Sequence, residues 1–176
     1  FVLYLIPYTF CLSQIVTIKG KADTSYLSET DTIYALTYDD YISYREKELA
    51  NSPIDTKGNF NLSFPVSQAA YIFLMVDNAK AEMVAEPNKT YEINFLAKDS
   101  DAANTLSMAV PVEIEFNNSD PAELNYLMAD FTNRYEAFLE YHRPLIAKKD
   151  PAIFAKIDTM QTLCNNKYSS YKNSYL

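Results

Sequence analysis

The amino-acid sequence predicts a mainly β fold, an antiparallel two-sheet β-sandwich followed by an α-helical C-terminal extension. Over residues 15–116, short apolar runs alternate with polar residues and are separated by turn residues, with no helical spacing between them. From residue 118 onwards, apolar residues recur every three or four positions, as on one face of a helix. Aromatic residues make up 14% of the 176 residues, which suits half-buried sheet surfaces. We therefore expect a sandwich domain over residues 14–117 and a helical segment over residues 118–176.

The first 13 residues form an uncharged, almost wholly apolar run that ends at Gln14. A membrane-spanning helix needs about 20 apolar residues, so this run is too short to be one. It matches the apolar part of a secretory signal peptide, in which the small residue Ser13 precedes the cleavage point. We predict a partial signal peptide over residues 1–13, whose basic leader precedes the printed sequence. The protein would then be exported to the periplasm, the cell envelope or the extracellular space.

Two other interpretations of this apolar run stay open. One makes it a buried first strand of the domain, although Pro7 at its centre argues against a central strand. The other makes it a lipoprotein signal in which Cys11 is acylated, although that chemistry needs a small residue before the cysteine and Phe10 is bulky. We adopt cleavage after Ser13.

The first half of the expected sandwich contains four strands. The first ends at Gly20, and a second alternates over residues 34–38 before the acidic corner at Asp39. Residues 41–49 are extended but heavily charged, which indicates an edge strand or a strand with only one buried face. Residues 55–59 then form a turn in which Asp can bond its own backbone and Gly58 supplies a positive φ. We expect this turn to close a hairpin with a strand over residues 60–64, on which Phe60, Leu62 and Phe64 face one way.

The second half begins with residues 71–76, which are apolar on both faces and therefore predict a central strand. Turns at residues 77–78 and 86–89 separate it from short strands over 81–85 and 91–95. Residues 97–109 predict a loop. Residues 110–116, with Val110, Val112, Ile114 and Phe116 on one face, predict a single last strand.

Two helices are expected after the sandwich. Asp120, Pro121 and Glu123 match the N-cap, first position and capping-box acid of a helix that ends near Pro144. Asp150 and the proline after it repeat the start signal for a second helix, which has no stop signal before the printed sequence ends. We expect that helix to continue in the natural protein. The apolar positions of the two helices are Leu124, Leu127, Phe131, Tyr135, Phe138 and His142, then Ile153, Ile157, Met160, Cys164, Tyr168, Tyr171 and Tyr175.

The charge and glycine content exclude several functional classes. The net charge of −8 and the pI near 4.6 disfavour nucleic acid and anionic lipid as partners. Two glycines are too few for a Walker or dinucleotide phosphate loop. No apolar run after the signal approaches the length of a membrane span.

The sequence also lacks recognisable catalytic or metal-binding patterns. Its two cysteines, Cys11 and Cys164, form no C-x-x-C pair, and we expect Cys164 to be a small buried hydrophobe. The only histidine, His142, lies close to the expected end of the first helix, where a cation suits the helix dipole. We therefore predict no enzyme activity, no cofactor, and no catalytic, cofactor-binding or metal-binding residues.

The acidic pairs and the tyrosines near the end of the sequence have structural explanations. The pair Glu113/Glu115 projects from one strand face into solvent, and Asp39/Asp40 are adjacent in sequence, so neither shows the cleft geometry that glycosidases need. The pair Asp99/Asp101 lacks the glycine and the closing acid of a calcium loop. The stripe formed by the tyrosines at 168, 171 and 175 predicts either helix packing or a partner-binding surface.

Three short motifs in a fixed order carry a family resemblance. They are Ile18-Lys-Gly20, Asp55-Thr-Lys-Gly-Asn-Phe60 and Pro87-Asn-Lys-Thr-Tyr91. Over residues 15–96 the chain resembles the N-terminal β-sandwich module, of unknown function, of secreted thioredoxin-like (TlpA/ResA-type) envelope proteins of Gram-negative bacteria. The resemblance implies a following thioredoxin-like domain whose C-x-x-C motif would carry any redox chemistry, beyond residue 176. No active-site residue of that family is present in this chain.

Two functions are consistent with these observations. The first is a non-catalytic accessory or interaction module of an exported cell-envelope protein, which holds a protein partner or orients a downstream domain. The alternative is a sandwich that binds a glycan or peptide by itself, through exposed aromatic side chains.

Overall fold

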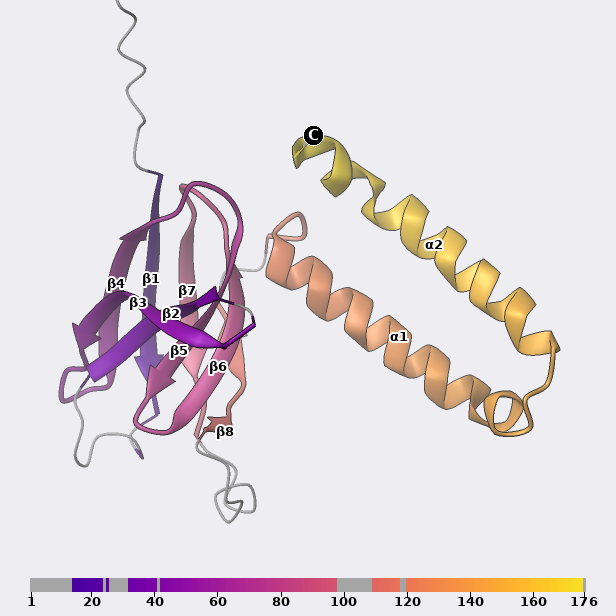
Figure 1. Cartoon of the computed structure of the whole chain (residues 1–176), viewed down its shortest axis with the longest axis horizontal. Helices are drawn as coiled ribbons and strands as arrows, with labels where there is room; N and C mark the ends of the chain where they lie inside the picture. The colour runs from indigo at the N-terminus through magenta and orange to yellow at the C-terminus, as the bar shows by residue number, and fades with distance from the viewer. Residues whose placement is uncertain are drawn as a thin grey trace, which may run out of the picture. The chain divides into compact units, whose positions relative to one another are not determined.

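The computed structural model describes residues 14–23, 25, 32–40, 42–97, 109–117 and 120–175, with side chains described as far as Ser169 in the last helix. The predicted signal segment, residues 1–13, lies outside the described residues. The chain forms two compact units, Phe1–Asn118 and Ser119–Leu176. The first is a two-sheet β-sandwich and the second a pair of helices, which confirms the predicted fold class (Figure 1).

The sandwich consists of a four-stranded and a five-stranded sheet, with strand orders β4-β1-β7-β9 and β3-β2-β5-β6-β8. Five of the seven strand pairs in the described residues are antiparallel, and the pairs β1–β7 and β6–β8 are parallel. The strand bounds are β1 (Ile15–Ala22), β2 (Thr32–Asp40), β3 (Arg45–Pro53), β4 (Asn59–Pro65), β5 (Ala70–Val76), β6 (Ala79–Ala85), β7 (Thr90–Phe95), β8 (Val110–Pro111) and β9 (Ile114–Phe116).

The core lies between the sheets and is built by alternation along the strands. In the four-stranded sheet, β1, β4 and β7 each bury every second side chain, because successive residues of a strand point to opposite faces. Each large apolar side chain buried in this way stabilises the fold by about 1.5–3 kcal/mol. The largest fully buried members from this sheet are Phe64, Phe95, Ile18, Leu62, Ile93 and Val16.

The strand predicted to be central, β5, lies in the middle of the five-stranded sheet and is buried on both faces. Ile72 and Leu74 point into the core, whereas Phe73 is fully buried without belonging to the core cluster. Its ring lies 5.0 Å from the Tyr38 ring, and the Lys80 ammonium group lies 4.0 Å from its centroid. This contact joins β2, β5 and β6 on the outer face of the sheet, with cation–π attraction contributing to it.

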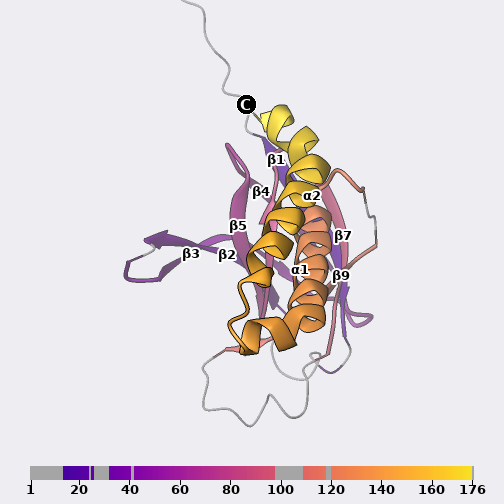
Figure 2. The same cartoon turned by 90° about the vertical axis from the view of Figure 1, so that its right-hand side faces the viewer.

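Strand β2 buries the side chains that alternate with its tyrosines, and the tyrosines themselves face away from the core. Ile33 and Ala35 are fully buried, whereas Tyr34 is 38% exposed. Beyond Leu36, β2 pairs only with β3, whose residues 45–48 are exposed. Figure 2 shows this two-stranded ribbon standing out from the rest of the sandwich. β3 is an edge strand, as predicted, but it begins at Arg45 because residues 42–44 form the turn that precedes it. Its charged side chains discourage pairing with another chain.

The turn at residues 55–59 forms as predicted, but it does not close a hairpin. Asp55 Oδ1 accepts the N–H groups of Lys57 and Asn59, both at 2.8 Å, and Gly58 has a φ of 88°. The strands on either side belong to different sheets, since β3 pairs with β2 and β4 pairs with β1. The turn is therefore a corner between the two sheets, and the hairpin prediction is wrong. Turn chemistry reverses the chain locally, whereas the pairing partner is decided by where the apolar face of β4 can be buried.

The predicted last strand is also divided between the sheets. Val110 pairs beside β6, whereas Ile114 and Phe116 pair with β7. The chain crosses between the two edges at residues 112–113, where the Val112 N–H donates to the Lys80 carbonyl (2.9 Å). The single alternating run at residues 110–116 therefore supplies one short strand to each sheet. Most of the predicted loop at residues 97–109 lies outside the described residues.

Helix α1 (Leu124–Ala147) begins one turn later than predicted. Its N-cap is Glu123, whose carboxylate accepts the N–H groups of Asn125 and Tyr126, each at 3.0 Å. Asp120 instead closes the turn before the helix by accepting the Ala122 N–H (3.0 Å). The capping-box prediction is wrong because the Glu123 carboxylate satisfies two free helical N–H groups by itself.

Helix α1 also continues through Pro144, so the predicted end near that residue is wrong. A proline inside a helix removes one hydrogen bond, but the Lys148 N–H still donates to the Pro144 carbonyl (3.3 Å). The helix ends in a Schellman motif, in which Lys149 has a φ of 54° and the Asp150 N–H donates to the Leu145 carbonyl (3.0 Å). Helix α2 (Ala152–Tyr175) starts at the predicted signal, with Asp150 accepting the Ala152 N–H. Neither helix is long and apolar enough to cross a membrane.

Gly20 lies where β1 is pressed between its neighbours, and this position predicts a large effect of a small substitution. A Cβ atom there would lie 2.5 Å from the Ile93 carbonyl oxygen and 2.6 Å from Cζ of Phe60. We expect Gly20→Ala to lower the free energy of unfolding by about 1–3 kcal/mol, measured by urea denaturation. Lys19→Ala, at the exposed neighbouring position, is the control and should change it far less. Equal midpoints for the two variants would contradict the close packing.

Candidate functional site

The helical pair exposes an unusual share of the apolar surface. Of the fourteen large hydrophobic side chains that are exposed in the described residues, ten lie on α1 and α2. Within α1 only Asn125 is buried, and within α2 only Ile153 is buried among the side chains that the structure describes. The ten are Tyr126, Met128, Phe131, Tyr135, Leu139, Tyr141, Ile146, Phe154, Ile157 and Leu163. Patches of this kind mark interaction sites more often than catalytic ones.

One side of the seam between the helices is hollowed into a groove of about 730 Å³, which we call the wide groove. It is lined by Phe131, Tyr135, Phe138, Leu139, Ile146, Lys149, Ile153, Phe154, Ile157, Met160, Gln161, Cys164 and Asn165. Lys149, at the turn between the helices, is the only charged residue among them. The wide groove therefore suits an apolar partner surface.

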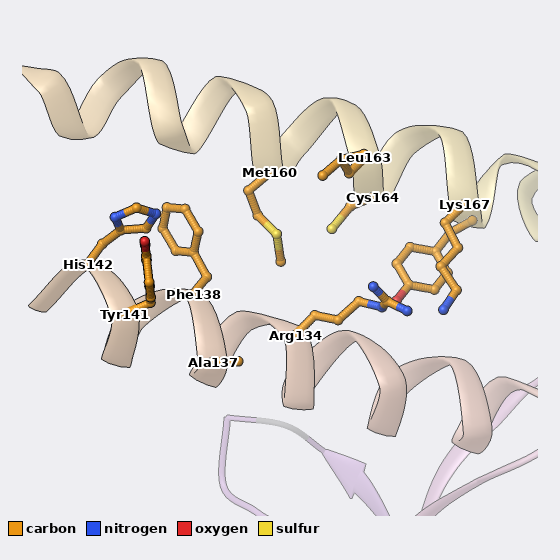
Figure 3. A pocket seen from close by; sticks show the side chains of 10 residues that line it. Arg134, Ala137, Phe138, Tyr141, His142, Met160, Leu163, Cys164 and Lys167 are labelled. Atoms are coloured by element: carbon orange, nitrogen blue, oxygen red, sulfur yellow. The ribbon is translucent and has the colours of Figure 1, made fainter.

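The other side of the seam carries a smaller groove of about 390 Å³, which we call the basic groove. Figure 3 shows Arg134, Phe138 and His142 of α1 facing Cys164 and Lys167 of α2 across it. The remaining lining residues are Ala137, Tyr141, Met160, Leu163 and Tyr168. Most of its polar side chains form hydrogen bonds, ion pairs or ring contacts within the hairpin.

Asp130 connects the two helices at the open end of the hairpin. Its Oδ2 atom accepts from Nε of Arg134 (3.0 Å), from Nζ of Lys167 (2.5 Å) and from the Tyr168 hydroxyl (2.5 Å). The Tyr168 ring also meets the Phe131 ring edge-on, with centroids 6.2 Å apart. Two of these donors come from α2, so the carboxylate sets the register in which α2 lies along α1.

These contacts shift two titrations in opposite directions. The hydrogen bonds from Lys167, Tyr168 and Arg134 hold the pKa of Asp130 well below its usual value. Burial is the main reason why the pKa of Tyr168 is raised to about 12, and the hydrogen bond to Asp130 and the negative charge of that carboxylate raise it further. The folded hairpin thus favours a charged Asp130 and a neutral Tyr168.

His142 does not have the role expected for it. Because α1 continues to Ala147, His142 lies more than a turn before the end of the helix, and the proposed dipole contact is wrong. Its ring instead packs against Phe138 and Tyr141, with centroids 4.7 Å and 4.8 Å away. No group of three potential metal-ligating side chains forms in the part of the chain that the structure describes.

The acidic pairs from the sequence are not brought together. Asp39 pairs with Arg45, and Asp40 accepts the Ile42 N–H (2.9 Å) in the turn of the β2–β3 ribbon. Glu113 and Glu115 are exposed, as expected. The pair Asp99/Asp101 lies outside the described residues, as does Cys11.

Cys164 and the tyrosine stripe contribute to the seam of the hairpin. Cys164 is half-buried and free, and it lines both grooves. Tyr168 packs within the hairpin, whereas the side chains of Tyr171 and Tyr175 lie outside the described residues.

The outer face of the five-stranded sheet is the second aromatic surface. Tyr44, 67% exposed, meets Tyr38 edge-on at 5.5 Å, and the Lys80 ammonium group donates to the Tyr38 hydroxyl (2.7 Å). The Tyr71 hydroxyl donates to Glu82. Most of these groups are occupied by one another, so the surface holds the strands together and leaves Tyr34 and Tyr44 as its exposed rings.

The comparisons with known proteins do not extend this description. No protein-family model and no curated protein matches the sequence. Among solved structures, the chain is similar to a candidate cell adhesion protein from Bacteroides fragilis, at 8% identity and a TM-score of 0.35. The match covers 61% of this chain and 46% of that protein, so it spans less than half of the latter's length.

The Asp130 network predicts how the stability of the hairpin depends on pH. A lowered carboxyl pKa adds stability that is fully present above the ordinary value of 3.8 and is lost only as the pH falls through the lowered pKa of the folded chain. A raised tyrosine pKa adds stability below 10.0 that is lost as the pH rises towards about 12. We expect Asp130→Asn to lower the helical melting temperature by a few degrees at pH 7 and by much less at pH 1, where Asp130 is protonated in the folded chain as well, followed by circular dichroism at 222 nm. Glu136→Gln, an exposed acid on the same helix, should have little effect, and an equal loss for Asp130→Asn at both pH values would contradict the assignment.

Proposed function

We propose that this chain is a non-catalytic interaction module of an exported cell-envelope protein, in which the sandwich is the scaffold and the wide groove of the helical hairpin binds protein. One observation carries the proposal: the hairpin exposes ten large apolar side chains, six of which line a groove with a single charged lining residue. The sandwich, by contrast, buries its apolar residues in one continuous core. A surface of this composition is stable in water when another protein covers it.

Export and the place of the module in a longer protein belong to the same proposal. The apolar run over residues 1–13 supports a signal peptide. The resemblance to the N-terminal modules of TlpA/ResA-type proteins supports a thioredoxin-like domain that follows the helices. In such a protein the hairpin would lie between the sandwich and the redox domain.

Export makes a prediction about the mature N-terminus. If residues 1–13 are a signal peptide, the protein recovered from its native cells begins at Gln14 and is found outside the cytoplasm. Mass spectrometry of the intact N-terminal peptide, on fractionated cells, measures both. A mature peptide that retains Phe10 and Ser13 would contradict the signal, and a lipid on Cys11 would support the lipoprotein alternative instead.

Protein binding at the wide groove is tested by site-specific photo-crosslinking in the full chain. A benzophenone amino acid at Leu139, which is 38% exposed in the groove, should form an adduct with another polypeptide chain. The same probe at Asn133, an exposed residue of α1 outside the grooves, is the matched control and should form none. The adduct is mapped by mass spectrometry to the peptide that meets the groove. An adduct only within the same chain, or none at either position, would overturn the proposal.

A further inference from the structure

We propose that the wide groove is covered by the wide groove of a second copy of this chain, so that two hairpins form a four-helix bundle. This inference rests on the proposed function, since it names the protein that the groove binds. It follows from three features of the described hairpin: the width of its apolar face, its charge, and the chemistry of the groove lining.

The apolar face of each helix is wider than one neighbour can cover. On α1, Phe138 lines both grooves and so lies at the seam, whereas Tyr135, Leu139 and Ile146 line the wide groove alone. These three form a second row, spaced by four and seven residues. A helix that packs against one partner needs a single narrow stripe, and a helix with two neighbours in a bundle needs a stripe about twice as wide.

Helix α2 repeats this pattern on the side that faces the same groove. Met160 and Cys164 lie along the seam, and Phe154 and Ile157 extend the apolar face outwards, with 67% and 44% of their surface exposed. Each helix therefore lacks one neighbour on the same side of the hairpin. A second hairpin supplies two helices at once, which is the number required.

The charge of the chain favours contact through the hairpin rather than through the sandwich. Residues 119–176 contain seven acidic and seven basic residues, so their net charge is zero. Residues 1–118 contain sixteen acidic and eight basic residues and carry the whole net charge of −8. Two copies of the sandwich repel each other, whereas two hairpins meet without net repulsion.

The lining of the groove is compatible with itself, as a two-fold interface requires. The same patch meets itself across a two-fold axis, so a charge near the centre would face its own copy. The one charged lining residue, Lys149, lies at the turn end of the hairpin. With the axis at the middle of the helices, the two Lys149 side chains would lie at opposite ends of a bundle about 36 Å long, from 24 residues at 1.5 Å each.

Sedimentation equilibrium of the full chain tests the inference. The wild-type chain should be a dimer whose dissociation constant changes little with salt, because apolar contacts are not screened. Leu139→Glu and Ile157→Glu should each weaken the dimer by at least about tenfold, because each buries an unpaired charge twice in a symmetric interface. Asn133→Glu and Asn166→Glu add the same charge to exposed positions of the same helices outside the grooves, and they should leave the dimer unchanged.

The outcomes separate this inference from the function on which it rests. The second copy is ruled out if the wild-type chain is a monomer whose circular dichroism at 222 nm does not change on dilution. It is also ruled out if Leu139→Glu and Ile157→Glu leave a dimer intact. If the chain is monomeric while the probe at Leu139 still forms an adduct with a different protein, the inference fails and the proposed function stands. A monomer without any intermolecular adduct overturns both. Tyrosine near-ultraviolet dichroism confirms that the sandwich of each variant remains folded.

Discussion

The constraint that governs this molecule is the number of neighbours that each apolar surface has. Apart from the protruding β2–β3 ribbon, the strands of the sandwich face the opposite sheet, so side chains such as Phe64, Ile72 and Phe95 are removed from water by the chain itself. The helices of the hairpin have one helical neighbour each, and their apolar faces are wider than that neighbour covers. Side chains such as Leu139 and Phe154 therefore stay exposed. Because burial of apolar area is the main stabilising term in folding, the hairpin needs a further surface in a way that the sandwich does not.

This difference gives each unit its role. In the proposed function the sandwich, with its continuous core and charged edge strand, is the scaffold. The hairpin is held in register by a few specific contacts, above all those of Asp130 with Lys167 and Tyr168. Such contacts specify the geometry of a surface while contributing little to its stability. A docking surface needs the geometry, because a partner can then bind without ordering the helices first.

Sequence patterns predicted where the strands of the sandwich lie better than they predicted which strands pair with each other. The alternation at Phe60, Leu62 and Phe64 correctly indicates a strand with one buried face, and the residues around Asp55 and Gly58 correctly indicate a turn. Neither pattern contains information about which sheet receives the strand, because that choice depends on residues distant in sequence. The division of residues 110–116 between the two sheets escaped prediction for the same reason.

In the helical hairpin, the sequence motifs did not fix the ends of the helices, and the contacts between the helices could not be predicted from the sequence pattern. The sequence marks Asp120 as the N-cap and Glu123 as the capping-box acid, whereas in the structure Glu123 is itself the N-cap. The left-handed residue that ends α1 is Lys149, where glycine would have marked the end. The spacing of Asp130 and Arg134 identifies an ion pair along α1, but the two donors from α2 follow from the turn length and could not be read from a pattern. The three- and four-residue spacing correctly predicts both helices, whereas the excess width of their apolar faces depends on how the two helices pack against each other.

Amide hydrogen exchange of the full chain, over a range of protein concentrations, tests the central claim most directly. The account predicts that α1 and α2 are protected at high concentration and lose protection on dilution, as their second neighbour dissociates, while β1, β5 and β7 keep theirs throughout. Helices that exchange as slowly as the central strands at every concentration would show that the hairpin is complete by itself, and would contradict the account.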